Sequence, residues 1–123
     1  MRVCKILIAS ISASIITFGA EGANLKPADK PGNADAGREF ALVACTACHV
    51  VAANQPFAPL LTGAPDFMAI ATRPDINAAS LRRRLTTLPH IPSKGQMGNP
   101  ELTDEHLANV IAYIMSMRQQ RTN

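Results

Sequence analysis

Residues 45–49 of the 123-residue chain have the sequence Cys-Thr-Ala-Cys-His, and this stretch decides what kind of fold the chain adopts. Cysteines three positions apart lie on the same side of a helical turn. The thiols of Cys45 and Cys48 can therefore reach the two vinyl groups along one edge of a porphyrin. His49, directly after the second cysteine, then projects its imidazole towards the iron. This spacing is typical of covalent c-type haem attachment.

Other uses of closely spaced cysteines stay open at this point. A thioredoxin-like redox pair follows a strand, whereas the residues ahead of Cys45 favour a helix. A zinc site needs four ligands, and His90 and His106 are available, but the chain has no second closely spaced pair of metal-binding residues. A haem-free thiol protein is the remaining alternative.

The composition indicates one small domain with few large side chains to fill a core. Hydrophobic residues make up 47% of the chain and charged residues 17%, which excludes a disordered protein. Aromatic residues make up only 4%, so a cofactor is a plausible source of core volume in so short a chain. The net charge of +3 is too small to suggest nucleic-acid binding, and a large multidomain enzyme is excluded.

The first 22 residues are typical of a secretory signal peptide rather than of a folded domain. Arg2 and Lys5 precede an apolar run over Ile6–Phe18, and small residues follow it. The run is shorter than the roughly 18–20 residues of a membrane-spanning helix, although an uncleaved N-terminal anchor is the alternative. Removal of the signal peptide on export would leave two of the three cysteines in the mature chain. The mature chain would then lie in the periplasm, which excludes nucleic acid as a partner.

Helix caps and apolar spacing predict an all-α domain over residues 34–123, with about four helices and long loops, after a Pro- and Gly-rich linker over 23–33. Helices are expected from Asp35 as a cap to about Cys45, from Asp66 to Ala71, from Asn77 as a cap through Leu88, and after Thr103 as a cap. The last helix has an apolar stripe at helical spacing, formed by Leu107, Val110, Ile111, Ile114 and Met117.

A haem iron has a second axial position, and several downstream side chains could fill it: Met68, Met97, Met115, Met117, His90 and His106. Met97 is favoured because it lies in a polar, glycine-flanked loop, where packing alone does not call for a methionine. The other three methionines lie in predicted helices and are expected in the core. His90 is the alternative ligand, and His106 is expected to be a polar residue of the last helix.

The chain from about Asn33 to Arg118 resembles the class I (monohaem) cytochromes c of the bacterial periplasmic type. The resemblance rests on residues 33–38, the 45–49 motif, Met97 followed by residues 102–105, and residues 110–114. It implies one domain wrapped around a single covalent haem c.

In such proteins the site residues follow from the motif. The resemblance implies Cys45 and Cys48 as thioether attachments, His49 as proximal ligand and Met97 as distal ligand to the iron. The carbonyl of Pro59 is expected to fix the His49 imidazole. The resemblance also implies that the first and last helices cross at Gly37, against the helix that contains Tyr113.

The function that the resemblance implies is one-electron transfer in the periplasm, without enzyme activity. Its partners would be a dehydrogenase or membrane complex as donor and an oxidase or reductase as acceptor. Arg82, Arg83 and Arg84 are a candidate docking patch for an acidic partner, or else a solvated helix face. Two alternatives are a cytochrome subunit of a larger exported dehydrogenase and a haem sensor or enzyme with a labile Met97, since Gly98 stands where the family commonly has proline.

Overall fold

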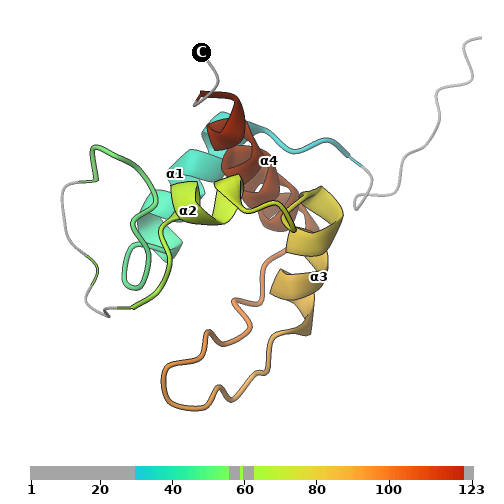
Figure 1. Ribbon diagram of the computed structural model, residues 1–123. Coiled ribbons are helices and arrows are strands. Elements are labelled where there is room, and N and C mark those ends of the chain that lie inside the picture. The colour runs from blue at the N-terminus through green and yellow to red at the C-terminus, as the bar shows by residue number, and fades with distance from the viewer. Residues whose placement is uncertain (1–29, 56–58, 60–62, 121–123) are drawn as a thin grey trace, which may run out of the picture.

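The structure is a computed structural model that describes residues 30–55, 59 and 63–120. Within these residues the chain forms α1 (Ala34–Ala44), α2 (Phe67–Thr72), α3 (Ala78–Thr87) and α4 (Asp104–Gln120), and no strand. The other three helices all pack against α4, and long loops follow α1 and α3 (Figure 1). The predicted all-α fold of about four helices is confirmed. None of the helices in the described part is long and apolar enough to cross a membrane.

The predicted signal peptide over residues 1–22 lies outside the described residues, as does most of the predicted linker. The end of that linker lies against α4. Gly32 approaches Ala108 so closely that a Cβ built at Gly32 would lie 2.0 Å from the Ala108 carbonyl oxygen.

Each of the four helices begins at a side chain that accepts a hydrogen bond from the first turn. Asn33 Oδ1 accepts from the Ala36 N–H at 3.0 Å, which makes Asn33 the cap of α1. The prediction of Asp35 as the cap is therefore wrong, and Asp35 lies inside the first turn of α1. Asp66 caps α2, Asn77 caps α3 in a reciprocal pair with Ser80, and Thr103 Oγ1 accepts from the third residue of α4 at 3.2 Å. Both Asn33 and Asp35 are residue types that satisfy free N–H groups at a helix start, and the sequence alone does not choose between them.

The core lies along the apolar face of α4. All five residues of the predicted stripe are buried, at 3–6% exposure. Phe67 and Ala71 bury one side of α2 against this face, whereas Met68 is 38% exposed. The expectation that Met68 is a core residue is therefore wrong, because it follows Phe67 directly and consecutive helical residues point about 100° apart. Met117 is buried and Met115 packs against the core from a half-buried position.

The crossing of α1 and α4 takes place at Gly37, as predicted. A Cβ at Gly37 would lie 2.0 Å from the carbonyl oxygen of Asn109 and 2.9 Å from Cβ of Tyr113. A hydrogen atom is the largest group that fits at this point of α1. The close approach holds α1 against α4, and near the end of α1 Ala41 lies in the core and Cys45 packs against it.

Two further contacts join α1, and the residue before it, to the first half of α4. The N–H of Asn33 donates to Asn109 Oδ1 at 2.8 Å. The ring of His106 stacks on Phe40, with centroids 4.2 Å apart and planes 21° apart. His106, expected only as a polar residue, therefore packs against α1.

Candidate functional site

The Cys45–His49 motif forms one tight turn at the end of α1. Cys45 is the C-cap of this helix, and its N–H donates to the Ala41 carbonyl at 3.0 Å. The N–H groups of Cys48 and His49 both donate to the Cys45 carbonyl, at 3.2 and 2.9 Å. Both thiols are half-buried and His49 is buried. The turn therefore brings two thiols and one imidazole together on five consecutive residues.

The His49 imidazole is held in a defined tautomer. Its exposed fraction is 8%, and Nδ1 lies 2.7 Å from the carbonyl oxygen of Pro65. Because a carbonyl oxygen only accepts hydrogen bonds, Nδ1 must be the protonated nitrogen. In the neutral ring this leaves a lone pair on Nε2, the arrangement in which histidines bind metals in proteins.

The carbonyl that orients His49 is that of Pro65, so the prediction of Pro59 is wrong. The N–H of Phe67 donates to the Val50 carbonyl at 2.9 Å, which brings the residues ahead of α2 back alongside the residue that follows His49. Pro59 lies in the same loop and is half-buried. Spacing along a proline-rich loop cannot show which carbonyl returns to the imidazole, because this depends on how the loop closes.

Aromatic rings pack behind His49, on the side of α2 and α4. The ring of Phe67 lies 5.5 Å from that of His49, and Tyr113 lies 6.3 Å beyond Phe67. The Tyr113 hydroxyl donates to the carbonyl of the fully buried Val51 at 2.7 Å. Burial raises the pKa of Tyr113, and the nearby Arg38 opposes this rise. Phe67 was not predicted as part of the site, and its signal in the sequence is an aromatic residue next to a cap in a chain with few aromatics.

The pKa of the Cys45 thiol distinguishes between the possible chemical roles of the two cysteines. Burial, and next the proximity of Cys48, raise the pKa of the Cys45 thiol to about 11. A thiol-redox pair needs a thiolate, and the reactive cysteines of such pairs have lowered pKa values. No group of three or more metal-binding side chains suited to zinc occurs among the described residues. The site is therefore unlike a redox pair or a zinc site.

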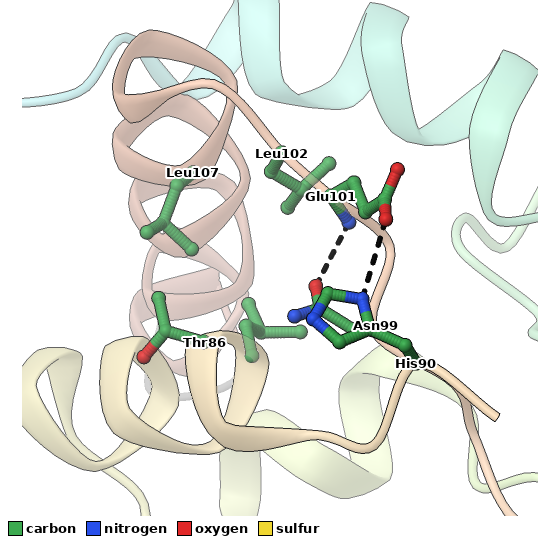
Figure 2. Close-up of a pocket in the computed structure, with 7 residues that line it drawn as sticks. Thr86, His90, Asn99, Glu101, Leu102 and Leu107 are labelled. Atoms are coloured by element: carbon green, nitrogen blue, oxygen red, sulfur yellow. Dashed lines mark hydrogen bonds and ion pairs between the residues drawn. The ribbon is translucent and has the colours of Figure 1, made fainter. Parts of the chain in front are cut away.

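A cavity of about 290 Å³ lies between α3, the start of α4 and the loop that joins them (Figure 2). Three leucines line it, together with four polar side chains. The full set is Leu85, Thr86, His90, Asn99, Glu101, Leu102 and Leu107. None of Cys45, Cys48 and His49 lines this cavity. The donor set on their turn fits a covalently bound haem, with two adjacent thiols for the vinyl groups and one free imidazole nitrogen for the iron.

Met97 lies on the loop between α3 and α4. Its exposed fraction is 42%, and it is not among the residues that line the cavity. The structure thus brings Cys45, Cys48 and His49 together on one turn and holds Met97 on a separate loop. The role of Met97 as distal ligand stays a prediction.

The arginine run on α3 is partly engaged by a neighbouring carboxylate. Arg84 lies 2.9 Å from Asp75, which also pairs with Arg73 at 3.1 Å. The hydrogen bond from Arg73 is the main cause of a lowered pKa at Asp75. Arg83 is exposed and Arg82 is half-buried.

Comparison with known proteins gives one finding. The sequence model of the family described as "Cytochrome c" matches residues 34–118, which is more than half of the chain and spans all four helices. No curated protein matches the chain, and no solved structure matches it either.

Proposed function

The chain belongs to the cytochrome c family, and from this premise we propose that it is a periplasmic one-electron carrier with a single covalent haem and His/Met ligation. Family membership supports haem-based electron transfer as the general activity. The number of haems, the ligand pair, the location and the role as a free carrier are our proposals. The residues proposed to hold the haem are Cys45, Cys48, His49 and Met97, with Pro65 as the orienting carbonyl.

One observation supports the haem site most strongly, namely the state of His49. Its Nδ1 is engaged by Pro65 at 2.7 Å while the ring is 8% exposed. A buried imidazole with one nitrogen fixed and the other free is suited to an axial ligand whose orientation must not change. The Phe67 ring at 5.5 Å limits rotation of the imidazole further.

When bound, the haem supplies the one-electron change between ferrous and ferric iron. The residues of this chain would hold the surroundings of the iron the same in both states. The Pro65 carbonyl holds the proton on Nδ1 of His49, and the carbonyl of Cys45 holds the turn on which His49 lies. The buried side chains along α4, which reach His49 through Phe67 and Tyr113, would exclude water from the imidazole. A thioether ligand at Met97 would favour the reduced state relative to two histidines.

For the partners, we propose transient docking to acidic redox proteins near Arg82, Arg83 and Arg84. Charge complementarity raises the rate of encounter without requiring tight binding. Because Arg84 already pairs with Asp75 at 2.9 Å, the exposed Arg83 is expected to contribute more to docking than Arg84.

Replacing Met97 with alanine is expected to abolish the far-red absorption band of ferric, Met-ligated haem and to leave the covalent haem in place. The measurement is the absorption spectrum of holoprotein made with a haem-attachment system. Met68→Ala is the matched control, since Met68 is also a partly exposed methionine, at 38% against 42% for Met97. A band that survives in Met97→Ala, or that disappears in Met68→Ala, contradicts the proposed ligand.

One observation favours a second candidate function, a haem protein that binds small ligands at the distal position. Met97 is 42% exposed and is followed by Gly98 rather than by a stiffening proline. Rapid binding of carbon monoxide to the ferrous wild-type protein would favour this function over the carrier. Slow or absent binding would favour the carrier.

A further inference from the structure

The two residues that follow His49 are held in place by two other helices. The Val50 carbonyl accepts a hydrogen bond from the N–H of Phe67, the first residue of α2, at 2.9 Å. The Val51 carbonyl accepts a hydrogen bond from the Tyr113 hydroxyl, on α4, at 2.7 Å. Val51 is fully buried, so this carbonyl needs a partner within the fold. The chain that leaves the imidazole is therefore tied to α2 and to α4.

The Tyr113 side chain starts where α1 and α4 approach one another most closely. A Cβ built at Gly37 would lie 2.9 Å from the Cβ of Tyr113. At the other end of the ring, the hydroxyl reaches Val51, which lies 62 positions earlier in the chain. The residue is 5% exposed, and its planar ring cannot shorten or bend. Tyr113 therefore spans the distance from the helix crossing to the chain that follows His49.

A cavity of about 430 Å³ lies beside this tyrosine. Tyr113 lines the cavity together with residues 50–54, whereas Phe67 and His49 do not. The rings of Tyr113 and Phe67 lie 6.3 Å apart, and those of Phe67 and His49 lie 5.5 Å apart. From the cavity inward, the order of the rings is therefore Tyr113, Phe67 and His49. Tyr113 is the ring that meets the solvent of the cavity first.

We propose that Tyr113 is a positioning residue for His49, which fixes the chain after the imidazole and keeps water of the cavity away from the ring. The proposal rests on His49 as an axial ligand, as proposed above. Groups around a metal-binding histidine set the tautomer and the orientation of its ring. Tyr113 is not assigned as a ligand, and it acts on His49 only through Val51 and Phe67.

The hydroxyl of Tyr113 matters because of what its loss leaves behind. The buried Val51 carbonyl would lose its hydrogen-bond partner, which is costly inside a protein. Water in the cavity is the nearest replacement, and the carbonyl reaches it when the segment opens locally. Such opening would also disturb the bond between Val50 and Phe67, whose ring lies against His49. The His49 Nδ1–H would then meet solvent more often.

The test is hydrogen exchange of the His49 Nδ1–H in the ferrous holoprotein, followed by NMR. Tyr113→Phe removes the hydroxyl and keeps the ring. Ser116→Ala is the matched control, because Ser116 Oγ donates to the Tyr113 carbonyl at 2.7 Å. This variant loses a hydroxyl-to-carbonyl bond of the same length on the same helix, but one that does not reach residue 51. The amide of Ile111, on the buried face of α4, reports opening of the whole domain.

In Tyr113→Phe, the His49 Nδ1–H is expected to exchange about five- to tenfold faster than in wild type, the change that corresponds to one buried hydrogen bond. The Ile111 amide should be accelerated less. Ser116→Ala should leave the His49 rate within about twofold of wild type.

Equal His49 rates in wild type and Tyr113→Phe would overturn the proposal and leave the axial ligation by His49 intact. Equal acceleration at His49 and at Ile111 would overturn it too, since the hydroxyl would then support only the stability of the whole domain. Failure of the proposed function gives a different result. The His49 ring signals of the wild-type protein would then lack the large shifts that a bound haem causes.

Discussion

Replacing Gly37 with alanine is expected to lower the free energy of unfolding by about 3 kcal/mol, within the range for overpacked positions. The new Cβ would lie 2.0 Å from the Asn109 carbonyl oxygen, so α1 and α4 must separate. Alanine is a better helix former than glycine by about 1 kcal/mol, but this gain is smaller than the cost of moving two packed backbones. Because the turn with the cysteines follows α1 directly, the yield of attached haem should fall too.

The measurement is thermal unfolding followed by circular dichroism. For a domain of this size about 3 kcal/mol corresponds to a fall in Tm of roughly 10–20 °C. Gly95→Ala is the control, since a Cβ there meets nothing within 4 Å, although Gly95 has φ +80°. Its expected loss is about 1–2 kcal/mol, from backbone strain alone. A Gly37→Ala protein at least as stable as Gly95→Ala would contradict the packing described for α1 and α4.

Replacing Arg118 with glutamine is expected to lower the free energy of unfolding by about 3 kcal/mol, because one guanidinium donates charge-assisted hydrogen bonds to three backbone carbonyls. Its Nε donates to the Ala71 carbonyl at 2.8 Å, and its Nη2 donates to the carbonyls of Arg73 and Ile76 at 3.0 and 2.8 Å. The last carbonyls of a helix lack partners within it. Arg118 therefore joins the end of α2 and the turn before α3 to α4.

Urea unfolding gives the loss of stability, and hydrogen exchange locates it. Amides between Ala71 and Asn77 should exchange faster in Arg118→Gln, since their segment loses its attachment to α4. Arg118→Lys should recover part of the stability, because an ammonium keeps the charge but not the planar fork of donors. Arg83→Gln, at an exposed position on α3, should change stability by no more than about 0.5 kcal/mol. Equal losses in Arg118→Gln and Arg83→Gln would contradict this role.

Features set by local sequence were predictable. The stripe on α4 follows from helical periodicity, and all of its residues are buried. The caps Asn77 and Thr103 follow from side-chain chemistry at a helix start. The turn formed by residues 45–49 follows from their spacing. Gly37 was predicted through resemblance, and the 2.0 Å approach to Asn109 gives its physical reason.

Features set by the closure of loops were not predictable from spacing. Pro59 and Pro65 both precede α2. The loop is closed by the hydrogen bond between Phe67 and Val50, and it is the Pro65 carbonyl that lies at His49. The contact of His90 with Glu101 could not be predicted for the same reason. It joins the two ends of a loop, and a local sequence pattern does not show that these ends meet.

Long side chains that reach across the fold were also missed. Arg118 holds carbonyls of residues 42 to 47 positions earlier in the chain, which no local pattern predicts. Met68 was predicted in the core because its neighbours are apolar. A helix of six residues has room for few buried positions, and Phe67 and Ala71 occupy them.

The intact mass of the protein under denaturing conditions tests the central claim most directly. After production with a haem-attachment system, the account predicts one haem that stays bound to the unfolded wild-type chain, held through Cys45 and Cys48. The variant with both cysteines replaced by alanine should show the mass of the bare chain. A wild-type protein of bare mass, or one that releases its haem on unfolding, would contradict the account.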